Sequence, residues 1–320
     1  MDGNNTKPLF SVIIPVYNKG GVVKRAIDSV LSQSFDDFEV IVVLDPSTDA
    51  SSEIVKSLSD DRLRVYERDK PGAGGYAARN LGIEMATGKW IAFLDADDEW
   101  FDFSLLKHNQ LIQKYDASMV CTSWQESDQH GLITNSRPVS ERVLELVDFY
   151  QAYAKEERLL NTNTISVKKE LFDRCGGFPV GKYLRGGDVA TWIKLAYAAG
   201  SVICSSVETA IYHREDSTVT KKIVPQIENN PVYDVCRDLA NNEYRDFTMQ
   251  KSLRKLSNRH IRYGLVCRAK DGSLCLSDMK YYSFIYSPFD YLVFLIWAVL
   301  PKKAGVFLAD ISLMMKRFLF

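Results

Sequence analysis

The sequence has no cysteine pattern that would build a disulfide framework or a zinc site. Its six cysteines lie far apart and form no CxxC pair, which indicates reduced thiols in a cytosolic protein. The segment MDGNNTKPLF at the start has no basic stretch followed by an apolar run, so no secretory signal is expected. From these absences we expect a cytoplasmic chain.

The sequence also lacks an excess of charge and a long apolar run. The 40 Lys and Arg side chains against 41 Asp and Glu give a net charge of -1, so the overall charge does not argue for a nucleic-acid partner. The apolar run Tyr291–Leu300 has ten residues, half of the ~20 that a helix needs to cross a bilayer. With 46% hydrophobic and 25% charged residues, the 320-residue chain has the composition of one large globular domain or two ordinary ones.

The most informative stretch of the sequence is Trp90–Asp98 (WIAFLDADD), a short apolar run that ends in three carboxylates. Such a run, bounded by polar residues, is typical of a buried strand in a parallel sheet. Asp95, Asp97 and Asp98 then lie at the carboxyl end of the strand, where open α/β sheets bind their ligands. Oxygen ligands suit Mg²⁺ or Mn²⁺, so the run predicts a metal-diphosphate site. The alternative is that the acidic cluster only forms a turn and a helix N-cap.

Strands and helices alternate through the first hundred residues. This alternation predicts an α/β fold with a doubly wound, mainly parallel sheet and helices on both faces. The edge formed by the carboxyl ends of its strands would collect Tyr17, Asp45 and Asp95. The expected strands are Leu9–Val16, Phe38–Leu44, Leu63–Glu67 and the run from Trp90, and the expected helices begin near Val22, Ser52 and Tyr76.

The pattern beyond Trp100 is less regular. We expect strands and helices there, but no motif names a ligand. The expected strands are Ala117–Trp124, Asn161–Val167 and Ser201–Ser205, and the expected helices are Phe103–Tyr115, Leu144–Tyr153 and Val189–Ala199.

Four ordered blocks of sequence resemble the family 2 glycosyltransferases, which have the GT-A fold and include bacterial sugar transferases of glycan and polysaccharide assembly. Three blocks, SVIIPVYN, EVIVVLDPSTDAS and GAGGYAARNLGIEMATGKWIAFLDADDEW, cover Ser11–Trp100. The fourth, GGFPVGKYLRGGDVATWIKLAYAAG, covers Gly176–Gly200 and is similar to the acceptor-side segment of the family. Four ordered blocks are far more specific than the DxD element, Asp95-Ala96-Asp97, would be alone. The resemblance implies that residues 1–220 form a catalytic domain that binds a nucleotide sugar.

The resemblance also implies which residues hold the nucleotide base. Two departures near them bear on base recognition. Leu44 stands where the family usually has Asp or Asn, and Pro46, which fixes its φ angle, stands where the family has glycine. The alternative for Tyr17 is an edge residue that packs on the first helix. The implied base-binding residues are Pro15, Val16, Tyr17 and Asp45.

Further contacts to the donor follow from the same resemblance. Arg79 would offer its planar guanidinium to the base or a phosphate, or else pair with a carboxylate as a surface arginine. Asp95 and Ala96 would lie against the nucleotide, with Asp95 reaching the ribose or a metal-bound water. Asp97 would bind Mn²⁺ or Mg²⁺ directly. Asp98 would cap the next helix or hold the metal-binding residues in position without contacting the ion.

The run AIYHREDSTVT (210–220) resembles the segment that closes over the diphosphate in the family. It would supply His213 as a further metal ligand and Arg214 as a phosphate contact. The alternative for His213 is a hydrogen-bonded structural residue at a strand end.

Asp188 is the residue to which the resemblance assigns general base catalysis. It opens a helix, where negative charge is favoured, and its alternative role is a simple N-cap. The family generally has a Glu-Asp pair here, so Gly187 is a departure that removes one carboxylate. Trp192, one turn later, would form a wall against the acceptor sugar or fill the core.

The last hundred residues (221–320) predict a helical region, which we expect to be membrane-associated. Between Arg245 and Lys270 there are eight Lys and Arg against one acidic residue, at a spacing typical of a basic amphipathic helix. The run around Trp297 and an amphipathic helix after Pro301 would add apolar burial in the headgroup region at the cytoplasmic face. The alternative is a helical subdomain that packs on the catalytic domain or on a second subunit of a homodimer.

The resemblance implies a metal-dependent, inverting glycosyltransferase that moves a sugar from a UDP-linked donor to a hydroxyl of a glycan or lipid-linked acceptor. Asp188 would take the acceptor proton while the cation neutralises the leaving diphosphate. Leu44, Pro46 and Gly187 leave open a noncatalytic nucleotide-sugar or glycan binding protein on the same fold. A nucleotidyltransferase is a weaker alternative, because the glycines beside Lys19 are too sparse for its phosphate loop.

Overall fold

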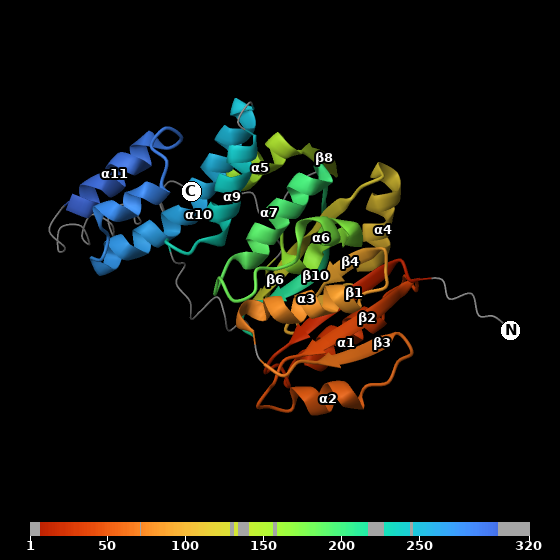
Figure 1. The fold of residues 1–320 in the computed structure, drawn as a ribbon. Helices are drawn as coiled ribbons and strands as arrows, with labels where there is room; N and C mark the ends of the chain where they lie inside the picture. Colours follow the sequence, from red (N-terminus) through yellow and green to blue (C-terminus); the bar gives the residue numbers. More distant parts are fainter. Residues whose placement is uncertain are drawn as a thin grey trace. The chain divides into compact units, whose positions relative to one another are not determined.

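The computed structural model divides the chain into two compact units, which are described one by one (Figure 1). The N-terminal unit comprises residues 1–149 and 158–221, and the C-terminal unit comprises residues 150–157 and 222–320. The structure describes residues 7–70, 72–128, 131–133, 141–155, 159–216, 227–243 and 246–299.

A mixed sheet with the strand order β3-β2-β1-β4-β9-β6-β10-β5 forms the centre of the N-terminal unit. Its first four strands are parallel, and β1 pairs with β2 on one side and β4 on the other. They are rich in branched apolar residues, and β1, β2 and β4 are buried almost throughout because helices cover both faces. The bounds are β1 Phe10–Val16, β2 Phe38–Leu44, β3 Leu63–Glu67 and β4 Trp90–Phe93.

The other half of the sheet contains antiparallel pairs that the sequence pattern did not predict. Strand β9 pairs antiparallel with both β4 and β6. It begins only at Ile165, after a short 3-10 turn at Thr162–Thr164, although a strand was expected from Asn161. The bounds are β5 Glu99–Trp100, β6 Met119–Asp128, β7 Gly131–Ile133, β8 Arg142–Glu145, β9 Ile165–Lys168 and β10 Ser201–His213.

Strand β10 continues through a stretch that was expected to contain two separate elements. Its 13 residues join the expected strand at Ser201 to the segment that carries His213. It pairs parallel with β6, with register shifts between Cys204 and Ala210 that accommodate the irregular middle. The last residues of the predicted closing segment, 217–220, lie outside the described residues.

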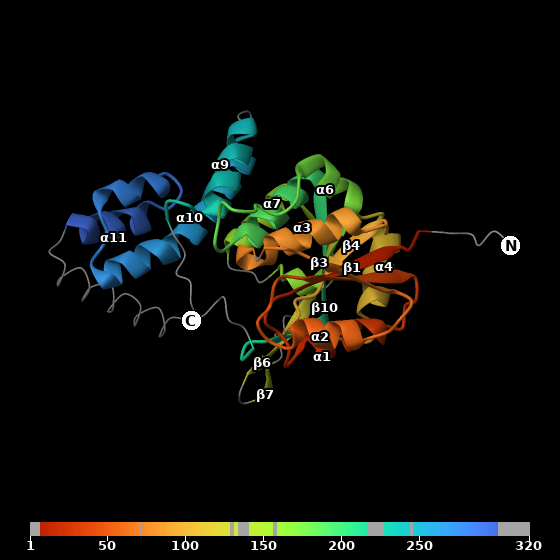
Figure 2. The ribbon, with the colours of Figure 1, turned by 60° about the horizontal axis from the view of Figure 1, so that its bottom comes forward.

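Helices cover both faces of the sheet, as Figure 2 shows. Alternate side chains of β1 point to opposite faces, so Val12 and Ile14 pack in the same core cluster as α1 and α4, whereas Ile13 faces α3. On the α3 face, Phe93 of β4 contacts Phe172 of α6 at a ring distance of 6.0 Å. The bounds are α1 Val23–Leu31, α2 Ser51–Ser57, α3 Tyr76–Met85, α4 Ser104–Tyr115, α6 Lys169–Cys175 and α7 Gly187–Ala199.

The C-terminal unit is helical, with a core of its own. Helix α10 supplies Ile261 and Leu265 to this core, and α11 supplies Phe294 and Trp297. The bounds are α9 Pro231–Asn242, α10 Phe247–Asp271, α11 Pro288–Val299 and a 3-10 segment at Leu276–Tyr281, and the end of α5 (Leu146–Ala154) also belongs to this unit.

This core corrects one expectation for the apolar run at 291–300. Trp297 is 8% exposed and packs on Phe294 at a ring distance of 5.5 Å, so its ring stabilises the unit and does not face a membrane. Within the ranges described, none of the helices combines the length and the apolarity needed to cross a bilayer. The amphipathic helix expected after Pro301 lies outside those ranges.

Candidate functional site

Polar groups gather where β1 and β2 end, as expected. Asp45 is buried directly after β2, and its backbone N–H donates to the Val16 carbonyl at 2.9 Å, which ties the two strand ends together. Its carboxylate accepts from Arg68 and, at 3.2 Å, from the backbone N–H of Gly72. Tyr17 is 50% exposed beside this edge, so its ring is free to pack against a flat ligand.

Arg79 occupies the space between α3 and the end of β4. Its guanidinium is almost fully buried, pairs with Asp95 and donates to the Gly74 carbonyl at 2.8 Å. Burial works to lower the pKa of Arg79, but the charges of Asp95 and Asp188 outweigh it and raise that pKa above its ordinary value. Arg79 is therefore a permanently charged arginine inside the fold, and not a surface residue.

Asp97 faces a lysine that the sequence analysis did not select. The Lys19 ammonium lies 2.5 Å from Asp97 Oδ2 and also donates to the Asp216 carbonyl at 2.8 Å. Burial and the nearby charge of Asp95 raise the pKa of Asp97, while Lys19 opposes that shift. The Asp97 carboxylate thus already has a cationic partner, supplied by the turn after β1.

Asp98 is fully buried and links the 3-10 turn before β9 to the end of β10. It accepts from Asn163 Nδ2 at 2.6 Å and from the backbone N–H of His213 at 2.7 Å. Burial, Asp97 and Asp95 raise its pKa well above the ordinary value. Asp98 is not the N-cap of α4, because Phe103 occupies that position. Its geometry instead fixes the end of β10 beside the DxD element.

His213, Glu215 and Asp216 form a group whose ligand atoms lie within 4.8 Å of one another in the part of the chain that the structure describes. His213 Nδ1 is 3.3 Å from Glu215 Oε1, and its buried Nε2 makes no hydrogen bond among the described atoms but lies 3.5 Å from Glu99 Oε1. An imidazole and two carboxylates are ligands that suit Mn²⁺. These residues therefore fit a divalent ion, although Asp97 would have to release Lys19 to join them.

Asp188 lies near Arg79, although the two residues are far apart in sequence. It is the second residue of α7, where Gly186 is the N-cap, so Asp188 is not a simple cap. Burial and the charge of Asp188 raise the pKa of Tyr76 to about 12, and the same charge acts on Arg79. The fold therefore brings the acceptor-side carboxylate into the electrostatic neighbourhood of Arg79 and Asp95.

Close packing explains why Gly187 replaces the acidic residue that the resemblance leads one to expect. Its backbone N–H donates to the Tyr76 hydroxyl at 2.9 Å. A Cβ at Gly187 would lie 2.8 Å from both Tyr76 Cζ and Pro179 Cγ, closer than a real Cβ contact allows. Tyr76 and Pro179 leave no room for a side chain at this position.

Replacement of Gly187 by alanine is expected to destabilise the protein by about 1–3 kcal/mol, the usual cost of overpacking. Urea unfolding of the full chain would measure this loss. Gly21→Ala is the matched control, because nothing lies within 4 Å of a Cβ there, and surface changes of this kind stay within about 0.5 kcal/mol. Equal stability of the two variants would contradict the packing explanation.

The structure also shows the surroundings of three further predicted residues, Trp192, Arg214 and Ala96. Trp192 is buried against Phe93 and Phe178 at ring distances of 5.5 and 5.4 Å, so it fills the core and is not a wall for an acceptor. The Arg214 side chain is 56% exposed and lies 3.3 Å from Glu126. Ala96 is buried, which limits it to contacts through its backbone.

Sequence reasoning missed several residues that organise this site. Asn163 accepts from the Asp95 backbone N–H at 2.7 Å as well as donating to Asp98. Arg25 pairs with Asp216 at 2.9 Å and donates to the Asp97 carbonyl. The position of Lys19 could have indicated a site residue, because Lys19 directly follows the first block, whose strand ends at the functional edge of the sheet. The sequence around Asn163 has no such feature.

A mixed α/β sheet with a carboxylate cluster at the ends of its central strands is the architecture of the GT-A fold. The structure superposes on that of residues 1–349 of S. aureus TarS in complex with UDP-GlcNAc with a TM-score of 0.73, 18% identity, and coverage of 94% of this chain and 88% of that TarS chain. That likeness confirms the expected fold class.

The sequence model of glycosyl transferase family 2 matches residues 11–177, and the chain belongs to this family of enzymes. TuaG of Bacillus subtilis, a putative teichuronic acid biosynthesis glycosyltransferase by its description, is 28% identical over 193 residues, 60% of this chain and 73% of TuaG. An uncharacterized glycosyltransferase of Rickettsia bellii is 41% identical over 121 residues, 38% of this chain but only 17% of that relative.

Proposed function

We propose that the protein is an inverting glycosyltransferase that takes a sugar from a UDP-linked donor, with Asp188 as general base. The observation that carries this proposal is the placement of Asp188 near the Arg79–Asp95 pair at the end of β4. A carboxylate held near a buried guanidinium can accept a proton from an attacking hydroxyl as a general base. The UDP-GlcNAc bound by TarS supports UDP as the carrier.

The donor would lie along the carboxyl ends of β1, β2 and β4. Exposed Tyr17 offers a ring to the base, and Asp95 faces the ribose. Arg68 and Gly72 hold the buried Asp45 carboxylate in place, so it would contact the base through its remaining lone pairs. The full set that we assign to the donor is Pro15, Val16, Tyr17, Asp45, Arg79, Asp95, Ala96 and Arg214.

We assign the cation, Mn²⁺ or Mg²⁺, to Asp97 and His213, with Glu215 and Asp216 beside them. A bound divalent ion would supply positive charge to the leaving diphosphate. Lys19 holds Asp97 in position without it, and Arg25 orients Asp216. Both side chains present positive charge to the same edge of the sheet.

Calorimetric titration of the full-length protein with UDP-sugars, with Mn²⁺ and with EDTA, tests this function. Binding of at least one UDP-sugar, tighter with Mn²⁺, is expected, followed by transfer to a hydroxyl with inversion at the anomeric carbon. Donor binding without turnover on any glycan acceptor would favour the noncatalytic binder that Leu44, Pro46 and Gly187 left open.

We further propose a glycan or lipid-linked acceptor and peripheral attachment to the cytoplasmic membrane face. Support comes from an exposed apolar stripe on α11, formed by Phe289, Leu292, Ile296 and Val299. Such a stripe suits the headgroup region of a bilayer or a second copy in a homodimer. Co-sedimentation with vesicles and measurement of the solution mass separate the two: sedimentation supports the membrane, and a stable dimer that stays in the supernatant supports the subunit interface.

A further inference from the structure

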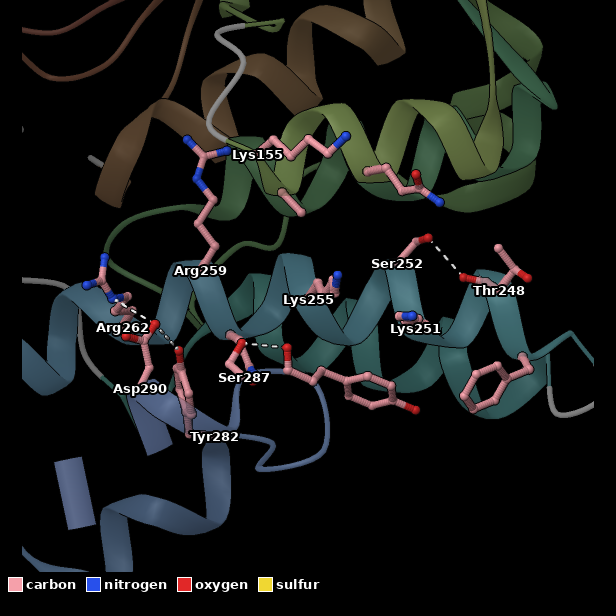
Figure 3. A pocket seen from close by; sticks show the side chains of 15 residues that line it. Lys155, Thr248, Lys251, Ser252, Lys255, Arg259, Arg262, Tyr282, Ser287 and Asp290 are labelled. Atoms are coloured by element: carbon pink, nitrogen blue, oxygen red, sulfur yellow. Dashed lines mark hydrogen bonds and ion pairs between the residues drawn. The ribbon is translucent and has the colours of Figure 1, made fainter. Parts of the chain in front are cut away.

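The C-terminal unit contains a groove of about 530 Å³, shown in Figure 3. Helix α10 forms its floor, and the end of α5 and the segment 282–290 form its sides. Its size lies in the range of small-molecule sites, roughly 300–1,000 Å³. All its lining residues belong to the C-terminal unit, whereas the proposed donor and metal residues belong to the N-terminal one.

Positive charge dominates the lining of the groove. Five of its residues are basic and one, Asp290, is acidic. Asp290 already has partners, since it lies 3.3 Å from Arg262 Nε and accepts from the Tyr282 hydroxyl at 3.2 Å. The other four positive charges remain without a carboxylate partner among the described residues, and these are Lys155, Lys251, Lys255 and Arg259.

These charges are arranged in a row. Lys251, Lys255 and Arg259 follow one another at intervals of four residues on α10, so they share one face of the helix. Like charges at this spacing destabilise a helix. A row of positive charges without neutralising partners therefore lowers the stability of α10. Arg259 reaches toward the end of α5 (Figure 3). There its guanidinium donates to the Tyr153 carbonyl. That bond fixes the guanidinium but does not neutralise it.

Uncharged groups line the rest of the groove. Gln151 and Tyr286 offer an amide and a hydroxyl, and the Phe247 ring is 65% exposed. Amides, hydroxyls and an exposed ring suit a polyhydroxylated ligand, whereas a row of Lys and Arg suits a phosphate group. The concave shape favours a small ligand over a flat bilayer surface.

We infer that this groove is a second ligand site, which binds a phosphate ester of a sugar or polyol. The phosphate would contact Lys251, Lys255 and Arg259, and the hydroxyls would face Gln151 and Tyr286. The site uses none of the residues assigned to the donor or the cation, so it does not depend on the proposed transfer reaction.

Titration of the full-length protein with glucose 1-phosphate tests the inference. We expect saturable binding, with glucose and acetate inactive at the same concentration and inorganic phosphate weaker. Lys251→Ala with Lys255→Ala should weaken binding about tenfold or more, because both charge-assisted contacts are lost. The control pair, Lys270→Ala with Lys280→Ala, removes the same charge from exposed positions outside the groove and should leave affinity unchanged.

Lysine acetylation followed by mass spectrometry locates the ligand. Glucose 1-phosphate should protect Lys155, Lys251 and Lys255 and leave Lys270 reactive. Equal loss of affinity in the control pair, or protection by phosphatidylglycerol vesicles but not by glucose 1-phosphate, would overturn a discrete site in favour of general charge attraction.

UDP-sugar titration of the same variants separates this site from the proposed function. The Lys251 and Lys255 double variant should bind UDP-sugars as the parent does. A parallel loss of UDP-sugar affinity would make the groove part of the donor site and overturn the inference. Absence of UDP-sugar binding in the parent, with glucose 1-phosphate still bound, would instead remove only the proposed function.

Discussion

Replacement of Asp188 by asparagine is expected to lower the rate of sugar transfer by roughly 100-fold or more while donor affinity stays near the parent value. General base catalysis contributes about 10²–10⁴-fold, and the amide cannot accept the proton of the attacking hydroxyl. Asparagine keeps the size of the side chain at the start of α7. Turnover with saturating UDP-sugar, measured beside calorimetric donor affinity, gives both quantities.

Asp173→Asn is the matched control for this variant. Asp173 lies on α6, just before the acceptor-side block of sequence, is exposed, and undergoes the same change from carboxylate to amide. Its activity should equal that of the parent. Near-parent transfer by the Asp188 variant would show that Asp188 only stabilises the start of α7 beside Tyr76 and Arg79.

Replacement of Asp97 by asparagine is expected to remove the Mn²⁺ dependence of UDP-sugar binding and to weaken binding in Mn²⁺ by about tenfold or more. The amide is a poor ligand for a hard cation, because it carries no negative charge. Affinity measured in Mn²⁺ and in EDTA separates two explanations. Loss only in Mn²⁺ indicates a metal ligand, and equal loss in both indicates that Asp97 acts through its ion pair with Lys19.

Asp28→Asn is the control for the Asp97 variant. Asp28 forms an exposed ion pair with Lys24, one turn apart on α1, and the side chains are 51% and 61% exposed. Exposed pairs of this kind contribute little to stability, so the control should bind UDP-sugars like the parent. If the Asp97 variant keeps full Mn²⁺-dependent affinity, the cation is bound elsewhere, with His213, Glu215 and Asp216 as the remaining group.

The sequence predicted the parallel half of the sheet because its signals are local. Strands β1, β2 and β4 are short apolar runs that end at polar residues, and each such run shows its burial within a few positions. The same logic placed Asp45 and Asp95 at one edge, since parallel strands end together. The ordered blocks then identified the family.

The strand pairing in the second half of the sheet could not be predicted from local sequence patterns. β10 is one strand of 13 residues, and its pairing with β6 shifts register in the middle. The alternation of apolar and polar residues is interrupted there, although the strand itself continues. The strand β9 is flanked by antiparallel partners, and nothing in its four residues specifies them. Pairing of this kind depends on which surfaces meet after the parallel half has formed.

The sequence by itself determined the fold class, the family and the types of residue offered to the site. Only the tertiary structure decided which of them meet, because the deciding contacts join distant positions. Lys19 bonds to the Asp216 carbonyl 197 residues away, and Asp98 accepts from His213 115 residues away. Local patterns carry no information about such pairs; they form because helices and strands that bury their apolar faces together bring the polar ends into contact.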